Sequence, residues 1–221
     1  MDFRRTLLVG VALTAVIVGG CTTGETSQAS SGDMIQAPMF EVDPFWPKPL
    51  PNHWILGSTI GVDVDSRDHV WIIHRQTTFA ANTEIGAAQD PPLSECCIPA
   101  PNILEFDADG NLVNSWGGPT EDGAYEWPQS NHGITIDHAD NVWIGGNGQA
   151  DAHVLKFTRN GEFLMQIGSS GARMTGMTNG RAIYEGGSND TENFGRVAEI
   201  GFDADRNEMY LADGYLNKRI A

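Results

Sequence analysis

The chain alternates apolar and polar residues in a pattern that occurs three times. Each copy leads from alternating apolar residues, through an Asp-rich turn, into a second apolar run. The copies are STIGVDVDSRDHVWIIHR (58–75), NHGITIDHADNVWIGGN (131–147) and AEIGFDADRNEMYLADG (198–214), the last with one extra turn residue. Alternation with a period of two predicts β-strands, so each copy predicts a hairpin.

A second hairpin unit follows each of the first two copies. These units are NILEFDADGNLVNSWGG (102–118) and HVLKFTRNGEFLMQIGS (153–169), with Gly110 and Gly161 at equivalent turn positions. Glycine supplies the positive φ that such turns need. Two hairpins make one four-stranded antiparallel sheet, and a repeated sheet of this kind is typical of a β-propeller. No stretch has a helical period, so the predicted class is all-β.

The run 70–73 is apolar on both alternations, which predicts a sheet covered on both faces by neighbouring blades. Residues 38–57 form a lead-in segment and residues 58–221 the partial propeller. The blades span 58–118, 131–169 and 197–221, and the third contains only its first hairpin. About two and a half blades leave sheet edges open, so we expect a fragment of a longer protein. A short chain that closes its ring by oligomerising is the alternative.

Two insertions interrupt the repeats, at 76–101 and 170–196, and are predicted to be long loops on the rim or over one face. The first carries Cys96-Cys97, an adjacent pair that could form a disulfide or remain two thiols. Three aspartates recur at the turns of the repeats, namely Asp65, Asp137 and Asp203. We expect them to accept backbone N–H bonds rather than to act in catalysis.

The N-terminus has the pattern of a bacterial lipoprotein signal peptide over residues 1–20. Two arginines precede a short apolar run, and small residues lead directly to Cys21. The pattern predicts a lipid anchor on Cys21 and a location on the periplasmic or cell-surface side of a bacterial membrane. Residues 21–37 are rich in Ser, Thr and Gly and are predicted to be a flexible tether.

The formal net charge of −16 narrows the class of partner. A chain this acidic repels a phosphate backbone, which argues against nucleic acid as a partner. A peptide or small-molecule substrate stays compatible with this charge.

Three polar residues fall at strand ends from which different blades can converge: Arg75, His132 and Tyr215. Taken singly, each has a structural explanation, as a rim ion pair, a turn histidine or a packed aromatic ring. Among the other histidines, His69 and His138 are predicted to be solvated. His74 either supports Arg75 or is structural, and His53 and His153 lie away from the axis.

The segments VWIIHR, NHGITIDHADNVWI and YLADGYLNKRI, in this order, resemble the NHL-repeat six-bladed propellers. The likeness is greatest to the peptidyl-α-hydroxyglycine α-amidating lyase family and covers residues 58–221, with weak support from GGSNDTENFG (186–195). It implies an N-terminal fragment of a bacterial relative. It also implies a metal-dependent lyase that cleaves the C–N bond of an α-hydroxyglycine-type substrate, giving an amide and glyoxylate.

The resemblance also implies particular site residues. His132 falls on the first of three zinc histidines, Arg75 on a catalytic arginine, and Tyr215 on the proposed base. The backbone carbonyls of Val62 and Ile134 correspond to ligands of a structural calcium. Zinc held by imidazoles keeps an open position for a substrate oxygen, and calcium prefers oxygen ligands.

Departures from the family pattern limit these implications. The two other zinc histidines would fall beyond residue 221, so the chain by itself is predicted to be inactive. Leu216 stands where the family has a cysteine. The alternative function is a non-catalytic NHL propeller that binds a peptide or protein partner. A calcium-dependent lactone or ester hydrolase is a third reading.

Overall fold

The computed structural model describes residues 37–81, 86–87, 89, 91, 93, 96–185 and 187–221. All strands lie in a unit formed by residues 43–221. The predicted signal peptide, Cys21 and nearly all of the predicted tether lie outside the described residues. Within the described ranges, no helix has the length and apolar character needed to cross a membrane.

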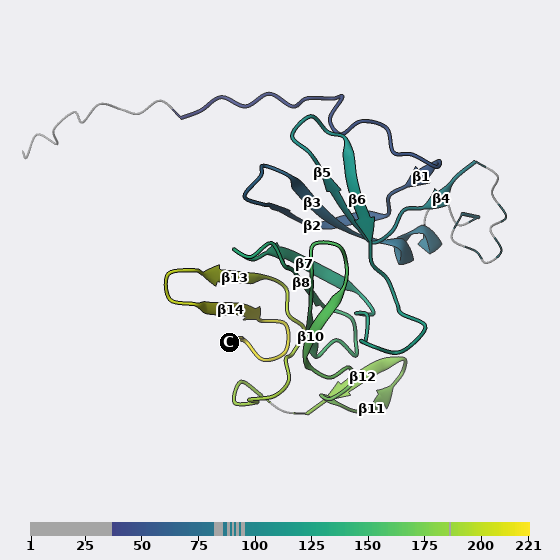
Figure 1. Cartoon of the computed structure of the whole chain (residues 1–221). Helices are drawn as coiled ribbons and strands as arrows, with labels where there is room; N and C mark the ends of the chain where they lie inside the picture. The colour runs from purple at the N-terminus through teal and green to yellow at the C-terminus, as the bar shows by residue number, and fades with distance from the viewer. Residues whose placement is uncertain are drawn as a thin grey trace, which may run out of the picture. The chain divides into compact units, whose positions relative to one another are not determined.

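Two four-stranded antiparallel sheets form the centre of this unit (Figure 1). The first has the order β2 (Ser58–Val64), β3 (Val70–Arg75), β5 (Ile103–Phe106) and β6 (Leu112–Trp116). The second has the order β7 (Asn131–Ile136), β8 (Val142–Gly146), β9 (His153–Phe157) and β10 (Phe163–Gly168). Each strand pairs with its sequence neighbour in the sheet, as in a propeller blade, which confirms the predicted all-β class.

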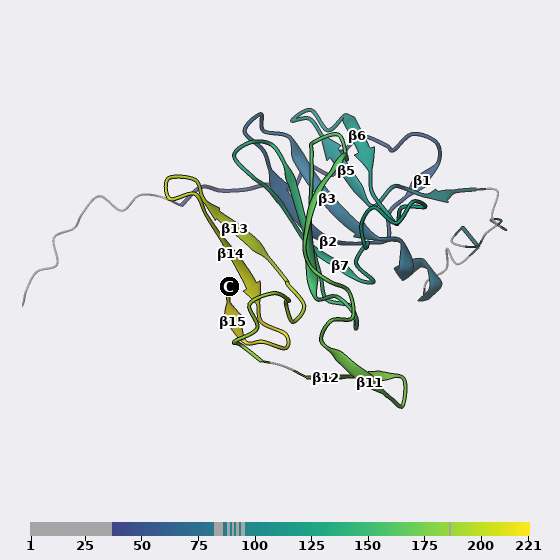
Figure 2. The same cartoon turned by 60° about the horizontal axis from the view of Figure 1, so that its bottom comes forward.

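A third sheet follows the same order with β13 (Ile200–Asp203), β14 (Glu208–Asp213) and β15 (Arg219–Ile220), as Figure 2 shows. Strands β2, β7 and β13 each come first in their sheets, and β7 contacts both of the others. The three sheets therefore line up by their first strands, which brings the ends of these strands together.

The turns of the three repeats share one backbone conformation. Asp68, Asp140 and Asn207 occupy the same turn position and have left-handed φ values of 59°, 60° and 54°. Asp and Asn tolerate this conformation better than most residues because their short polar side chains bond locally. The predicted turn glycines Gly110 and Gly161 also have positive φ, at 79° and 85°.

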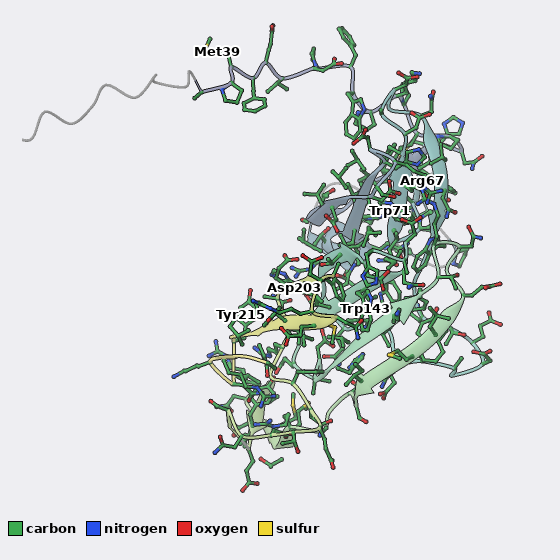
Figure 3. The ribbon with its side chains drawn as sticks, turned by 60° about the vertical axis from the view of Figure 1, so that its left-hand side comes forward. Met39, Arg67, Trp71, Trp143, Asp203 and Tyr215 are labelled. Carbon is green, nitrogen blue, oxygen red and sulfur yellow. A yellow bond between two sulfur atoms is a disulfide. The ribbon has the colours of Figure 1, made fainter. Side chains whose placement is uncertain are left out.

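The turn aspartates accept the backbone bonds that the sequence predicts. Asp137 Oδ1 lies 2.9 Å from the backbone nitrogens of both Ala139 and Asn141, and its Oδ2 accepts the Trp143 indole N–H at 2.9 Å. Asp65 is bonded in the same way, with the Trp71 indole N–H at 3.0 Å. Figure 3 shows these two tryptophans in successive sheets. Each aspartate therefore fixes its turn to the following strand.

This bonding makes the stability of the fold depend on pH. Burial by itself raises the pKa of Asp137, but hydrogen bonds from Trp143, Asn141 and Ala139 outweigh it and lower the pKa from 3.8 to about 2. A carboxyl whose folded pKa lies below its unfolded value stabilises the fold above the unfolded pKa, and this contribution disappears as pH falls toward the folded pKa. We expect Asp137 to contribute about 2 kcal/mol that is lost between about pH 4 and pH 2.

Urea unfolding at about pH 5 and about pH 2.5 measures this contribution. The difference in unfolding free energy between the two pH values should be about 1.5 kcal/mol smaller in Asp137→Asn than in the unsubstituted protein, because a pH of about 2.5 is still above the folded pKa. An equal difference in the two proteins would show that the Asp137 carboxyl is not linked to folding.

The core is divided between the sheets. One cluster joins buried side chains of the first and second sheets: Trp71, Ile73, Ile103, Ile134, Val142, Ile144, Leu155 and Phe157. On the opposite face of the first sheet, the lead-in segment covers β3 and β5, where Trp46 and Leu50 pack with Ile72, Leu104 and Phe106, whereas β2 stays exposed at Val62 and Val64. The prediction that neighbouring blades cover both faces of this run is therefore wrong for one face, because the lead-in segment fills it.

The two insertions contain regular structure that the sequence analysis missed. Residues 76–101 contain a 3₁₀ turn, η1 (Gln76–Ala81), and β4 (Ile98–Pro99), which pairs in parallel with β1 (Trp54–Ile55). Cys96 and Cys97 form a disulfide, which decides between the two alternatives left open by the sequence.

The second insertion contains a β-hairpin, β11 (Met174–Thr178) with β12 (Arg181–Tyr184). Asn179 and Gly180 at its turn have φ values of 48° and 73°. Two successive positive φ values with an Asn-Gly sequence are typical of a two-residue hairpin turn. The Asn179-Gly180 dipeptide therefore could have predicted this hairpin from the sequence. The prediction of a loop over the whole of 170–196 is therefore wrong.

Candidate functional site

Arg75, His132 and Tyr215 come from three different sheets and lie in one network. Arg75 ends β3, His132 lies in β7, and Tyr215 follows β14. The Tyr215 hydroxyl lies 3.2 Å from His132 Nε2, and the two rings meet edge to face with centroids 5.9 Å apart. Tyr215 is half exposed, and in Figure 3 it lies away from Trp71 and Trp143.

Asn147 connects Arg75 with Tyr215. The Asn147 Oδ1 accepts from Arg75 Nη2 at 2.9 Å, and its Nδ2 donates to the Tyr215 hydroxyl at 3.3 Å. Arg75 Nε also donates to the backbone carbonyl of Asn131 at 2.9 Å, which fixes the guanidinium between the first two sheets. The arginine therefore reaches the tyrosine through an amide rather than directly.

The sequence analysis did not identify Asn147, although a signal existed. In the aligned repeats VWIIHR and VWIGGN, Asn147 occupies the position that Arg75 has in the first copy. Equivalent strand ends of successive blades deliver side chains to the same place, so this alignment could have found it.

The hydrogen bonds of His132 define its tautomer. Its Nδ1 lies 3.0 Å from the carbonyl oxygen of Ala198, which can only accept, so Nδ1 carries the proton. The lone pair is then on Nε2, which accepts from the Tyr215 hydroxyl. A neutral imidazole whose other nitrogen is fixed by a backbone carbonyl is the form that binds metals in proteins.

Two glycines allow the first strands to approach each other at this site. A Cβ on Gly133 would lie 2.6 Å from the Ala198 carbonyl oxygen, and one on Gly61 would lie 2.9 Å from that of His132. Any larger residue would push the strands apart and move His132 away from Ala198. Val62 and Ile134 follow these glycines on the adjoining strands β2 and β7; Val62 is exposed and Ile134 is buried.

The remaining histidines have structural partners or face solvent. His74 is fully buried, accepts from the Gly57 N–H at 3.1 Å and contacts the Pro101 carbonyl at 2.8 Å, so it braces the lead-in segment instead of Arg75. Burial lowers the pKa of His74 and outweighs the backbone bonds that would raise it. His138 and His53 are exposed. His153 is buried and contacts the Glu126 carbonyl at 2.6 Å.

His69 is not solvated as predicted, because it belongs to a second polar cluster. Asp65, His69 and Glu105 place their potential ligand atoms within 4.8 Å of one another, so a metal could be held there. Arg159 also enters this cluster, with Nη1 2.5 Å from Asp65 Oδ2 and a contact to Glu105. Since a guanidinium already compensates both carboxylates, we interpret the cluster as an ion-pair network between the first two sheets.

No protein-family profile matches the chain, but comparison with known proteins gives likenesses to a solved structure and to a curated protein. A solved structure, selenomethionine-substituted virginiamycin B lyase from Staphylococcus aureus, aligns with a TM-score of 0.34 and 15% identity, covering 69% of this chain and 48% of that one. Peptidyl-alpha-hydroxyglycine alpha-amidating lyase 1 of Drosophila melanogaster is 30% identical over 181 residues, which is 79% of this chain. The match spans 28% of that protein's length. In its sequence and in its repeated antiparallel sheets, the chain resembles the NHL-type propellers related to this lyase.

Proposed function

We propose that the protein is a metal-dependent lyase that cleaves an α-hydroxyglycine-type substrate into an amide and glyoxylate. The supporting observation is the convergence of Arg75, His132 and Tyr215 from three sheets, with the Tyr215 hydroxyl 3.2 Å from His132 Nε2. The name of the similar Drosophila lyase indicates the same class of substrate.

Tyr215, Asn147 and Arg75 have different roles in the proposed cleavage. The Tyr215 hydroxyl first loses its own proton to solvent, and its oxygen then takes the proton of the substrate hydroxyl as the carbonyl of glyoxylate forms. The C–N bond breaks, its electron pair stays on nitrogen, and Tyr215 passes the proton it has taken to that nitrogen to complete the amide. The Asn147 N–H and, behind it, the Arg75 guanidinium stabilise negative charge on the tyrosine oxygen, since both donate along one chain.

The His132 side chain fits a metal ligand because the Ala198 carbonyl fixes its Nδ1, and the lone pair of Nε2, which accepts from the Tyr215 hydroxyl in this structure, faces the site. We propose zinc as that metal, which would polarise the substrate oxygen as a Lewis acid. We further propose that the backbone carbonyls of Val62 and Ile134 hold a calcium ion, since these residues lie on adjoining strands.

Metal analysis and product assay of the protein, expressed from its complete reading frame, test this proposal. Zinc content and glyoxylate release are compared for the unsubstituted protein, His132→Ala and the control His138→Ala, whose side chain is exposed. We expect His132→Ala to lose at least about tenfold in zinc affinity and in glyoxylate release, and His138→Ala to keep both.

Zinc binding that is unchanged in His132→Ala would show that this histidine is not a ligand. Peptide binding without any glyoxylate release from the unsubstituted protein would instead support the non-catalytic propeller.

A further inference from the structure

Arg196 differs from most of the arginines that lie in the interior. Five arginines in the described ranges are buried or half-buried: Arg75, Arg159, Arg173, Arg196 and Arg219. Three of these pair with carboxylates, namely Arg159 with Asp65, Arg173 with Asp190 and Arg219 with Asp213. Within the described part of the chain, Arg75 and Arg196 have no carboxylate within 4.0 Å. Removing a charge from water without a counter-charge is unfavourable, and 29 acidic residues were available as partners.

The main chain just before and just after Arg196 forms hydrogen bonds with segments of the candidate site. The carbonyl of the preceding residue, Gly195, accepts from the Leu216 N–H at 3.1 Å, directly after Tyr215. Two residues after Arg196, the carbonyl of Ala198 accepts from His132 Nδ1 at 3.0 Å. The main chain on either side of Arg196 is therefore bonded next to Tyr215 and to His132, the two residues whose side chains meet at the site.

The guanidinium is held by an aromatic side chain instead of an acid. Its central carbon lies 4.7 Å from the centroid of the Tyr184 ring, and Nη2 donates to the Tyr184 hydroxyl. That hydroxyl donates in turn to the Gln149 carbonyl at 2.5 Å, two residues after Asn147. The remaining donors are not all used, since the buried Arg196 Nε has no hydrogen-bond partner among the described residues.

The backbone and the hairpin of the second insertion both fix this arrangement. Arg196 has a φ of 71°, which is uncommon for a residue with a Cβ and is maintained only where the surroundings enforce it. Gln149 Oε1 accepts from the Ala182 N–H at 2.6 Å and thereby ties β12, which carries Tyr184, to the loop after Asn147. The hairpin therefore acts as a support for the arginine.

We propose that Arg196 binds the carboxylate of a small 2-hydroxy or 2-oxo acid at this site, positioned by Tyr184. The proposal rests on the proposed function, because an α-hydroxyglycine and glyoxylate both carry a carboxylate next to the reacting carbon. A chain of net charge −16 repels such anions at a distance, so a local uncompensated guanidinium is needed to hold one. Guanidinium also matches carboxylate in geometry, which a lysine would not.

Binding of two small probes, measured by calorimetry, tests this role without any turnover. The probes are glyoxylate and its uncharged amide, glyoxylamide. We expect Arg196→Gln to weaken glyoxylate binding by about tenfold or more and glyoxylamide binding by less than about twofold. Tyr184→Phe should give a smaller loss with the same preference. Arg181→Gln, which removes an exposed arginine from the same hairpin, is the matched control and should change neither.

Two results would overturn the proposal: equal binding of the two probes by the unsubstituted protein, or equal effects of Arg196→Gln on both. Melting temperatures of the variants show whether the fold is kept, and Tyr184→Phe provides the second test if Arg196→Gln unfolds. If the unsubstituted protein releases no glyoxylate but still binds glyoxylate more tightly than glyoxylamide, the proposed lyase activity is contradicted and the anion site is supported. If it releases glyoxylate but binds the two probes equally, the anion site alone is contradicted.

Discussion

Replacement of Tyr215 by phenylalanine is expected to lower kcat for glyoxylate release by about 10²- to 10⁴-fold, the usual contribution of a positioned general base. The substitution removes only the hydroxyl that links His132 Nε2 to Asn147. Tyr215 is 50% exposed, so its loss should change the unfolding free energy by less than about 0.5 kcal/mol. A large effect on rate with a small effect on stability is the signature of a residue that acts on substrate.

Tyr210→Phe is the matched control. Tyr210 is 43% exposed, and its hydroxyl contacts the exposed Glu208 in its own strand. We expect Tyr210→Phe to change kcat less than about twofold, since among the described residues its hydroxyl bonds to Glu208 and to none of Arg75, His132, Asn147 and Tyr215. A Tyr215→Phe protein with kcat within about threefold of the unsubstituted value would remove Tyr215 from the role of base.

The sequence predicted the sheets because their determinants are local. Alternating apolar residues indicate which segments form strands, and the Asp, Asn and Gly residues at the turn positions adopt left-handed φ more readily than other residues do. The meeting of Arg75, His132 and Tyr215 could be expected for the same reason. Arg75 and Tyr215 lie where the second strand of a repeat ends and His132 where a first strand begins, and these ends lie at the same edge of an antiparallel hairpin. The repeated strand pattern thus indicates where each residue lies within its blade. Residues at the same edge of successive blades are then expected to lie close together.

The missed features depend on partners that are distant in the sequence. Asn147 has no motif of its own and becomes important only because Arg75 and Tyr215 lie on either side of it. Arg196 is one basic residue in a long insertion, and the ring of Tyr184 that holds it belongs to a hairpin whose strands MTGMT and RAIY have little apolar alternation. Alignment of the repeats could have marked the position of Asn147, whereas the role of Arg196 depends on tertiary contacts that no local pattern reports.

Arg159 is the clearest example of such a partner, and its removal is expected to have the largest effect on stability. It lies in the turn between β9 and β10 of the second sheet and reaches the Asp65 turn of the first. Its guanidinium lies 5.0 Å from the centroid of the Trp71 ring and is only 17% exposed. We expect Arg159→Met to lower the unfolding free energy by about 3 kcal/mol, because it leaves the buried Glu105 carboxylate without its guanidinium and leaves Asp65 with only the more distant Arg67, 3.8 Å away. Urea denaturation measures this loss.

A second substitution separates lost charge from lost packing. The Glu105 side chain is 2% exposed beside His69 in the unsubstituted protein, so adding Glu105→Gln to Arg159→Met removes the buried charge that the first substitution leaves without its guanidinium. We expect the double variant to recover about 1 kcal/mol or more, as neighbours in one network are not additive. Arg206→Met is the control, since Arg206 is 70% exposed and its only ion pair within the described ranges is with Asp203 of its own turn. That change should cost less than about 0.5 kcal/mol, because an exposed pair contributes little.

Equal losses for Arg159→Met and Arg206→Met would mean that the Asp65 cluster does not join the two sheets, and that the apolar cluster around Trp71 and Phe157 holds them together by itself.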